Sequence, residues 1–450
     1  MAQLEQVTEL GPVGTALKER ILSRQALVAV IGAGYVGLPL AVEKAKVGFH
    51  VVCVEQNPVR ANMVNTAQNY IRDVKDEDLT ELVGAGLIKA TTSFDVLADA
   101  DVIVICVPTP LTDNKDPDIS YIVNVTRQIA AHIRPGQLVS LESTTYPGTT
   151  QEVVLPMLAA SGLKVGEDFF VSFSPERVDP GNARYTTKNT NKVVGGVTPA
   201  CLDVACTMYR KTILNVIPVS SPAVAEMTKV FENTYRAVNI ALVNELAMLC
   251  DRMDLDVWEV LDAAATKPFG IQIFYPGPGV GGHCIPLDPF YLAWKAREYD
   301  FSTRFIELAG EINLRMPYFV KDKVVRALGE AGKPLFGSKI LVLGVAYKRD
   351  IVDERESPAL KVIQLLEKEG AHVVYHDPYI PEVHPHGWFK QHMTSVDLTE
   401  ELWSTVDAVV ITTDHKTVDY TEVARKASII VDTRNAMKGV PQGNAKVIKL

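Results

Sequence analysis

The stretch Val30-Ile31-Gly32-Ala33-Gly34-Tyr35-Val36-Gly37 links an apolar run at residues 26–31 to a segment with helical spacing. Its glycines follow the pattern G-x-G-x-x-G. Gly32 permits a tight turn after a strand, and Gly37 lets a helix pack closely against that strand. The sequence therefore predicts a strand, a turn and a helix, the opening unit of a doubly wound α/β domain.

A second apolar run, at residues 339–343, meets Gly344 in the same way. Each start is followed by short apolar runs that alternate with helical stretches. These runs occupy residues 50–55, 101–108, 137–143 and 169–173, then 372–375, 408–412 and 428–431. Continuous apolar runs of this length are typical of parallel strands covered on both faces. We therefore expect two Rossmann-like doubly wound domains.

Between the two halves the pattern becomes helical. From about residue 221 to residue 254 apolar side chains recur at helical spacing, at Val224, Met227, Phe231, Tyr235, Val238 and Leu242. No proline interrupts this segment after Pro222, so it predicts one long helix, with further helices to about residue 329. The expected fold is α/β, with the two sheet domains joined by this long central helix and a helical middle domain. Such a helix can pack against a partner subunit, so we expect a homo-oligomer formed through the central helices.

Composition excludes several classes of protein. The 450 residues carry a net charge of −9 without a long basic block, which argues against nucleic-acid binding. No apolar run reaches the ~18 residues of a membrane span, and the first 25 residues lack the features of a signal peptide. The six cysteines include no C-x-x-C pair, so we expect no metal site or disulfide framework. We expect a cytoplasmic protein with reduced thiols.

Glu55 ends the strand that follows the glycine loop. A carboxylate there accepts hydrogen bonds from the ribose hydroxyls of NAD and repels the 2′-phosphate of NADP, although the nearby Arg60 leaves NADP as an alternative. Thr109 and Thr144 follow later strands, at the edge where such sheets bind ligands, but they can equally serve as turn formers. The residues expected to contact NAD are Gly32, Gly34, Tyr35, Val36, Gly37, Glu55, Arg60, Thr109 and Thr144.

The least ordinary stretch is Tyr275-Pro276-Gly277-Pro278-Gly279-Val280-Gly281-Gly282-His283-Cys284-Ile285-Pro286-Leu287-Asp288-Pro289. Glycines at this density can wrap the backbone around a ligand and present N–H groups to it. Cys284 follows them at the expected start of a helix, where its pKa can fall and the thiolate can form. A buried loop cysteine is the alternative.

Lys229, Asn233 and Arg236 share one face of the long helix, away from the apolar stripe. A solvated polar face is the ordinary explanation. The segment 173–181 adds Glu176 and Arg177 at a strand end. A thiol, a carboxylate, an ammonium and an amide are the groups needed to oxidise an alcohol past the aldehyde, because the thiolate captures the aldehyde and fixed donors hold the oxyanion.

Together these motifs resemble the UDP-glucose/UDP-mannuronate (UDP-sugar 6-) dehydrogenase family over residues 26 to about 434. They are the Gly32–Gly37 loop, Ser174–Arg177, the Lys229/Asn233 helix, the Cys284 loop, and Ala346-Tyr347-Lys348-Arg349-Asp350 followed by Arg355-Glu356-Ser357-Pro358. The resemblance implies a four-electron oxidation of the C6 alcohol of a UDP-sugar to a carboxylate, with two NAD⁺.

The resemblance also implies roles for single residues. Cys284 would carry a thiohemiacetal and then a thioester, Lys229 and Asn233 would stabilise the oxyanion, and Glu176 and Asp288 are the acid/base candidates. The residues implied for UDP-sugar binding are Arg177, Arg236, Tyr275, Gly277, Gly279, Gly281, Lys348 and Arg355. The implied parts are an extension at 1–25, an NAD-binding domain at 26–205, a helical middle domain at 206–329 that carries the cysteine loop, and a UDP-sugar-binding domain at 330–450.

Sequence details favour one branch of this family. Members specific for UDP-glucose often carry a lysine where this chain has Leu287. The stretches 142–148 and 283–286 look more like the branch that acts on N-acetylated hexosamines. Within that branch, residues 270–282 and 290–295 are similar to UDP-N-acetylglucosamine 6-dehydrogenases. UDP-N-acetylmannosamine is the close second candidate. A non-catalytic UDP-sugar sensor and a two-electron dehydrogenase of the 6-phosphogluconate type are the alternatives from other classes.

Overall fold

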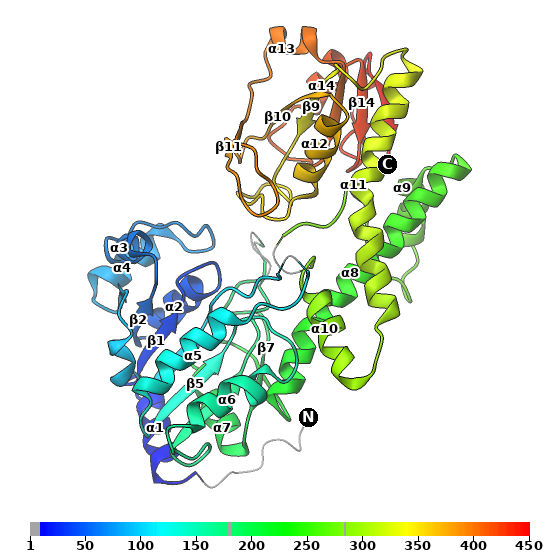
Figure 1. Cartoon of the computed structure of the whole chain (residues 1–450). Coiled ribbons are helices and arrows are strands. Elements are labelled where there is room, and N and C mark those ends of the chain that lie inside the picture. Colours follow the sequence, from blue (N-terminus) through cyan, green and yellow to red (C-terminus); the bar gives the residue numbers. More distant parts are fainter. Residues whose placement is uncertain (1–9, 113, 179–181, 183, 283–284) are drawn as a thin grey trace. The chain divides into compact units, whose positions relative to one another are not determined.

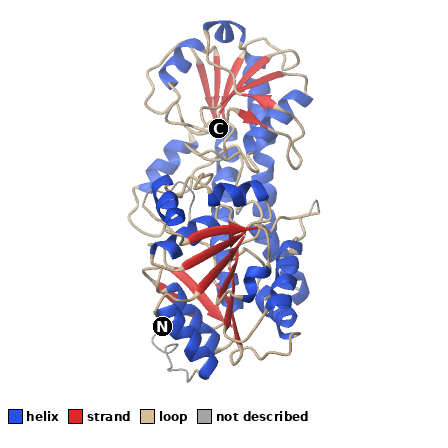
Figure 2. Ribbon diagram, turned by 90° about the vertical axis from the view of Figure 1, so that its left-hand side faces the viewer, coloured by secondary structure: helices blue, strands red, loops and turns tan. Residues whose placement is uncertain are grey.

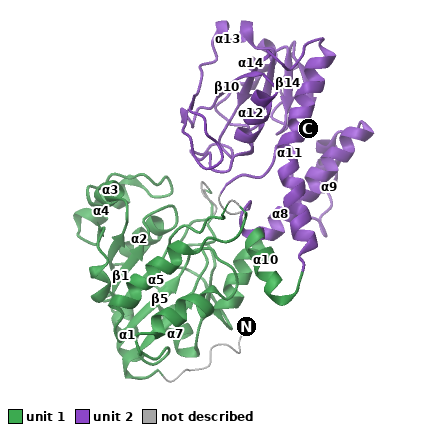
Figure 3. Cartoon of the chain, viewed as in Figure 1, with its two compact units in different colours: residues 1–232, 290–301 green, residues 233–289, 302–450 purple. Residues whose placement is uncertain are grey.

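The computed structural model describes residues 10–112, 114–178, 182, 184–282 and 285–450. The chain divides into two compact units, coloured separately in Figure 3. Unit 1 comprises residues 1–232 and 290–301, and unit 2 comprises residues 233–289 and 302–450. Each unit is built around one sheet.

Among the described residues, the sheet of unit 1 has eight strands in the order β3-β2-β1-β4-β5-β6-β7-β8. Strands β1, β2, β5 and β7 are labelled in Figure 1. Neighbouring strands pair in parallel except β6 and β7, which are antiparallel. The strands are β1 (Leu27–Ile31), β2 (His50–Val54), β3 (Ile88–Thr91), β4 (Val102–Ile105), β5 (Gln137–Leu141), β6 (Phe169–Phe173), β7 (Lys192–Gly196) and β8 (Val216–Val219). Every apolar run expected in this half is a strand; β3, β7 and β8 were not expected.

Helices cover both faces of this sheet. Val28 and Val30 of β1 face a core shared with α1, α2 and α7, whereas Ala29 and Ile31 face a second core shared with α5 and α6. This alternation follows from the two-residue period of a strand. The helices are α1 (Pro12–Leu22), α2 (Gly37–Lys46), α3 (Pro58–Asn65), α4 (Asp76–Gly84), α5 (Ser120–His132), α6 (Leu155–Ala159) and α7 (Pro199–Tyr209). Helix α1 gives part of the N-terminal extension a role, because it packs on α7 and Lys18 pairs with Asp203 at 2.7 Å.

The long helix is confirmed as α8 (Pro222–Met253). Its apolar stripe is exposed in this chain, with Phe231 at 61% and Leu242 at 62% of full exposure, whereas Lys229 and Asn233 are buried. The polar face is therefore not a solvated surface. The other helices of the middle region are α9 (Val257–Ala265), α10 (Asp288–Ala296) and α11 (Arg304–Glu330).

The sheet of unit 2 has five parallel strands in the order β10-β9-β13-β14-β15, with helices on both faces (Figure 2). The strands are β9 (Lys339–Leu343), β10 (His372–His376), β13 (Ala408–Ile411), β14 (Ile429–Asp432) and β15 (Lys446–Lys449), and a separate hairpin pairs β11 (Glu382–Val383) with β12 (Met393–Thr394). The helices are α12 (Pro358–Lys368), α13 (Glu400–Thr405) and α14 (Tyr420–Lys426). The expected fold class, two doubly wound α/β domains connected by a long helix and a helical middle region, is confirmed. None of the helices in the described part of the chain combines the length and apolar character of a membrane span.

Candidate functional site

The glycine loop between β1 and α2 has the geometry that its sequence predicts. Gly32 has a φ of +92°, and a β-carbon on it would lie 2.4 Å from the carbonyl oxygen of Cys106. A β-carbon on Gly37 would lie 1.8 Å from the carbonyl oxygen of Gly32. No atom of the described residues lies within 4 Å of the corresponding position on Gly34. Two glycines are thus required by close packing, and the middle one leaves open the approach that a pyrophosphate needs.

Glu55 follows β2 and supports this loop directly. One carboxylate oxygen accepts a hydrogen bond from the backbone N–H of Ala33 at 3.0 Å, and the other accepts one from the N–H of Asn57 at 2.9 Å. The Tyr70 hydroxyl donates to the Ala33 carbonyl at 2.7 Å, and the Arg60 guanidinium lies 5.9 Å from the centre of the Tyr70 ring. Each carboxylate oxygen has a second lone pair, so this support is compatible with accepting from a ribose hydroxyl.

Thr109 and Thr144 lie beyond the ends of β4 and β5. Because β4 neighbours β1 and β5 neighbours β4, both threonines belong to the same carboxyl edge as the glycine loop. The Thr109 carbonyl accepts a hydrogen bond from the Tyr291 hydroxyl at 2.8 Å, which fixes the backbone there. Ligands of doubly wound sheets bind at this edge.

Glu176 belongs to a buried ionic cluster in unit 1. Lys192, at the start of β7, lies 2.5 Å from a carboxylate oxygen of Glu142 and 3.6 Å from one of Glu176. The other oxygen of Glu142 accepts from the Tyr209 hydroxyl at 2.6 Å. Two backbone N–H groups, of Arg177 and Val178, donate to Glu176 at 2.8 Å each. The sequence motif indicates Glu176, but no pattern in the sequence indicates Lys192 as its partner.

The charge state of Glu176 follows from these contacts. Burial alone would raise the pKa of the carboxyl, but Lys192, the N–H of Val178 and Lys229 outweigh it and hold that pKa below its ordinary value. For Lys192, burial lowers the pKa, and the charges of Glu142 and Glu176 outweigh this and raise it. Both groups are therefore ionised at neutral pH. Glu176 can accept a proton from a water or hydroxyl, but it does not hold one to donate.

In unit 2, Asn233 joins two of the other predicted site residues. Its amide nitrogen donates to the Asp288 carboxylate, and its amide oxygen accepts from the Arg236 guanidinium. Asn233 and Asp288 are 1% and 3% exposed. Asp288 is the first residue of α10, where the helix dipole favours a negative charge. Cys284 lies outside the described residues.

The glycines before Cys284 pack on the segment at residues 346–358 of unit 2. A β-carbon on Gly281 would lie 2.6 Å from that of Tyr347, and the N–H of Gly282 donates to the Arg355 carbonyl at 3.0 Å. Gly279 has a φ of +140°, and a β-carbon there would lie 2.9 Å from Pro358. The structure thus brings together two motifs that are far apart in the sequence. Only glycines permit this contact.

The remaining residues expected at the UDP-sugar site are held in different ways. The Arg355 guanidinium bonds the carboxylate of Asp353, and Lys348 is half-buried in the same region. Tyr275 stacks on Trp258 with ring centres 5.7 Å apart and donates its hydroxyl to Asp262 at 3.0 Å. In unit 1, Arg177 bonds Glu232 at 2.5 Å and the carbonyl of Asn191 at 2.7 Å.

Arg434 was not expected at this site. A β-carbon on Gly277 would lie 2.5 Å from a guanidinium nitrogen of Arg434. The Nε of Arg434 donates to the Thr412 carbonyl at 2.9 Å. Burial and the nearby charge of Arg349 lower the pKa of Arg434 to about 10, so it stays charged at neutral pH. Arg434 directly follows β14, and this position could have indicated a ligand-binding residue, because ligands bind at the carboxyl ends of parallel strands.

Unit 2 repeats the arrangement of a carboxylate under a glycine turn. Asp377 follows β10 and accepts hydrogen bonds from the backbone N–H groups of Val345 and Ala346, at 2.7 and 2.9 Å, directly after Gly344. His415 lies 3.0 Å from the same carboxylate oxygen. Asp377 therefore occupies the place in the second sheet that Glu55 occupies in the first. The sequence pattern predicted a ligand-binding role only for Glu55.

Comparisons with known proteins identify the family of this chain. Residues 26–213 match the NAD binding domain of the UDP-glucose/GDP-mannose dehydrogenase family, residues 223–315 its central domain and residues 341–439 its UDP binding domain. The chain belongs to this family. It is therefore an NAD-dependent UDP-sugar dehydrogenase, and the expected family, enzyme class and cofactor are confirmed.

Individual relatives span nearly the whole chain. The UDP-N-acetyl-D-mannosamine dehydrogenase of Pyrococcus horikoshii is 36% identical over 92% of this chain and 97% of its own length. The UDP-N-acetyl-D-glucosamine 6-dehydrogenase of Pseudomonas aeruginosa is 35% identical over 78% of this chain and 83% of its own. The solved structure of the Pyrococcus horikoshii UDP-D-ManNAc dehydrogenase matches with a TM-score of 0.85 at 34% identity, covering 94% of this chain and 98% of that one.

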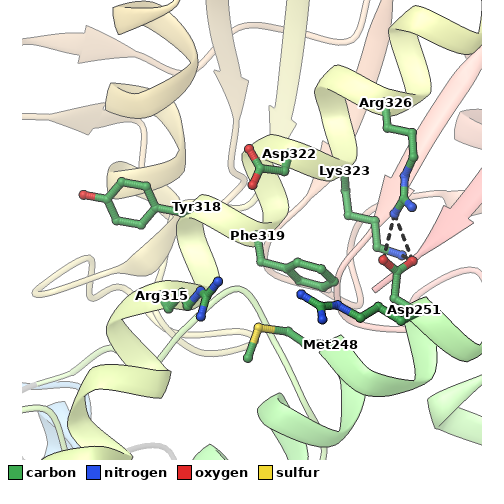
Figure 4. A pocket seen from close by; sticks show the side chains of 9 residues that line it. Met248, Asp251, Arg315, Tyr318, Phe319, Asp322, Lys323 and Arg326 are labelled. Atoms are coloured by element: carbon green, nitrogen blue, oxygen red, sulfur yellow. Dashed lines mark hydrogen bonds and ion pairs between the residues drawn. The ribbon is translucent and has the colours of Figure 1, made fainter.

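A pocket of about 370 Å³ lies elsewhere in unit 2, between α8 and α11 (Figure 4). Its basic side chains Lys323 and Arg326 pair with Asp251, at 2.6 and 2.9 Å. The lining residues are Met248, Asp251, Arg252, Arg315, Tyr318, Phe319, Asp322, Lys323 and Arg326. None of them belongs to the motifs of this family described above, so this pocket is not the candidate site.

Proposed function

We propose that this dehydrogenase oxidises the C6 alcohol of a UDP-N-acetylhexosamine to the uronic acid, and that its substrate is UDP-N-acetylglucosamine. The observation that carries this proposal is the buried hydrogen bond between Asn233 and Asp288. It fastens the start of α10, just after Cys284, to the helix that also carries Lys229. The ammonium of Lys229 and the carboxylates of Glu176 and Asp288, together with the cysteine that precedes α10 in the sequence, are groups that suit an oxidation through a covalent intermediate.

We assign NAD to the first sheet and the UDP-sugar to residues of unit 2. Glu55 and the glycine loop after β1 would hold NAD at the carboxyl edge of the first sheet, where the described atoms leave room beside Gly34 and the Glu55 carboxylate has lone pairs left for a ribose hydroxyl. NAD⁺ would supply the hydride acceptor for each of the two oxidation steps. The UDP-sugar is held by the glycine loop with Lys348 and Arg355, and Arg434 adds a charge suited to the diphosphate.

Residues of this chain form the covalent intermediates, stabilise them and take part in their hydrolysis. The Cys284 thiolate adds to the C6 aldehyde to form a thiohemiacetal, whose second oxidation gives a thioester. Lys229 and Asn233 stabilise the negative oxygen that forms at C6. Glu176 is ionised in the resting enzyme, so it accepts a proton from the water that hydrolyses the thioester. Hydrolysis releases the uronate and regenerates the thiol.

The choice of sugar rests on the sequence of the cysteine loop. The stretches 270–282 and 290–295 look like those of UDP-N-acetylglucosamine 6-dehydrogenases, and the Pseudomonas aeruginosa relative carries that name. UDP-N-acetylmannosamine is the second candidate, because the Pyrococcus horikoshii relative matches over more of the chain. The two substrates differ only in the configuration at C2.

One assay tests both the reaction and the sugar. The purified enzyme is given NAD⁺ with UDP-N-acetylglucosamine, UDP-N-acetylmannosamine, UDP-N-acetylgalactosamine or UDP-glucose, and NADH is followed by its absorbance. We expect the highest kcat/KM with UDP-N-acetylglucosamine and two NADH per sugar. One NADH per sugar would contradict the four-electron reaction, and a preference for another sugar would contradict only the choice at C2.

We also propose that the enzyme is a homo-oligomer formed through α8. Val224, Met227, Phe231 and Leu242 are all more than 40% exposed on one side of this helix. Large apolar side chains that recur along one exposed helix face are typical of a subunit interface. A second copy of the same helix offers a complementary apolar surface.

A further inference from the structure

The hairpin β11–β12 of unit 2 gathers two histidines and a glutamate on one face. Glu382 pairs with Thr394 and Val383 with Met393, so the next pair in this antiparallel register is His384 with His392. Side chains alternate along a strand, which places Glu382 and His384 on the same face. The opposite face carries Val383, which is fully buried in the core of unit 2.

The distances among these groups fit a bound metal ion. The Nε2 atoms of His384 and His392 lie 3.5 and 3.6 Å from Oε2 of Glu382, and the three ligand atoms all lie within 4.8 Å of one another. Hydrogen bonds to oxygen are shorter than this, about 2.7–3.2 Å. Ligands on a tetrahedral zinc ion with bonds of about 2.1 Å are about 3.4 Å apart. The two histidine–glutamate distances are therefore close to the spacing of ligands on a tetrahedral zinc ion.

The hairpin holds these ligands on an anchored frame. Phe389 is 1% exposed, and its backbone exchanges two hydrogen bonds with that of His386, at 2.8 and 2.9 Å, which closes the loop between the strands. The side chains of the three ligands are more than half exposed, so an ion reaches them directly and keeps a position for water. Two imidazoles and one carboxylate suit zinc and its neighbours in the transition series.

We propose that Glu382, His384 and His392 bind a divalent transition-metal ion of the zinc type, with water completing a tetrahedron. The ion links two very short strands, so its binding stabilises the hairpin. The hairpin also contacts the segment proposed to bind the UDP-sugar, because the Trp388 indole N–H donates to Glu356, next to Arg355, at 3.2 Å. The expected absence of metal rested on cysteine spacing; these ligands come together only through strand pairing.

Zinc titration of the protein without a histidine tag tests this site. The protein is stripped with EDTA and titrated with Zn²⁺ by calorimetry, in the Cys284→Ser background so that the thiol cannot bind the ion. We expect one ion to bind with micromolar affinity and to raise the Tm. His384→Ala and His392→Ala should each weaken binding more than about 100-fold, since even outer-shell changes cost about 10–100-fold. His372→Ala, an exposed histidine on β10 of the same unit, is the matched control and should bind as before.

Two further measurements make the outcome decisive. Co²⁺ bound at the site should give the visible absorption of a tetrahedral ion, and this should be lost in His392→Ala. Metal binding should weaken as the solution is acidified, because protons compete with the ion for its ligands. The proposal is overturned if Zn²⁺ does not bind in the micromolar range, or if His384→Ala binds it as tightly as His372→Ala does. Neither result affects the proposed oxidation.

Discussion

Glu176 depends for its charge on residues from other elements. The carboxyl follows β6, whereas Lys192 starts β7 and Lys229 lies on α8. Because burial would by itself favour the neutral acid, the neighbouring ammonium groups decide which form is present. A base that must take a proton from water is useful only in its ionised form. If Glu176 is the base, as we propose, this cluster sets the lowest pH at which the enzyme completes hydrolysis.

Replacing Lys192 tests this dependence. In Lys192→Met the pKa of Glu176 should rise, so the carboxylate form is lost at a higher pH than in the wild type. The acidic limb of kcat against pH should move to higher pH. The change also leaves Glu142 buried without its cation, which should cost about 3–5 kcal/mol of stability, measurable by urea unfolding.

Lys192→Arg is the control, since it keeps the positive charge. It should retain most of the wild-type pH profile. If Lys192→Met has an unchanged acidic limb while its stability falls, Lys192 is purely structural and Glu176 is not the base.

The proposed nucleophile gives a second prediction for a single residue. Cys284→Ser should lower uronate formation by more than about a thousandfold, the scale seen when a covalent nucleophile is removed. Binding of NAD⁺ should be unchanged, as measured by fluorescence titration. Uronate formation at the wild-type rate in this variant would exclude the covalent route.

Single residues also show what sequence can and cannot reveal about the site. Glu176, Lys229 and Asn233 stand in motifs that mark them without a structure. Lys192 and Arg434 were missed, because their roles come from neighbours that are distant in the sequence. Asp377 has the same place as Glu55, but no glycine triplet precedes it to draw attention to it.

At the scale of elements, continuous apolar patterns predicted the central strands. The strands that were missed are short or carry polar residues and glycines, such as Ile88–Thr91 and Lys192–Gly196. β3, β8 and β15 lie at sheet edges, and many of their side chains are partly or fully exposed, so their sequences lack a continuous apolar run. The long helix was predicted, but the face that this chain leaves uncovered became clear only from the structure.

The junction of β1 with α2 gives a prediction at this scale. Gly37→Ala places a methyl group against the Gly32 carbonyl and forces α2 away from β1. Overpacking of this kind costs about 1–3 kcal/mol. We expect a lower Tm and an NAD⁺ affinity reduced by about tenfold or more, because about 1.4 kcal/mol is one power of ten.

Gly84→Ala is the matched control, since Gly84 ends α4 and nothing lies within 4 Å of the added methyl. This change should leave NAD⁺ binding intact and keep or raise the Tm, because alanine is favoured over glycine in a helix. Equal losses of affinity in both variants would show that the close contact at Gly37 does not matter.

At the scale of the whole molecule, the uncovered stripe of α8 predicts the assembly. Phe231 is 61% exposed near the middle of the stripe, so a charge there would be desolvated in any interface that covers it. Phe231→Glu should convert the oligomer to monomers at micromolar concentration, as measured by sedimentation velocity. Leu214→Glu changes a side chain that is 72% exposed but lies off this helix, and it should leave the assembly intact. A wild-type protein that sediments as a monomer, or an oligomer that Phe231→Glu does not weaken, would mean that another surface covers the stripe or that it stays exposed.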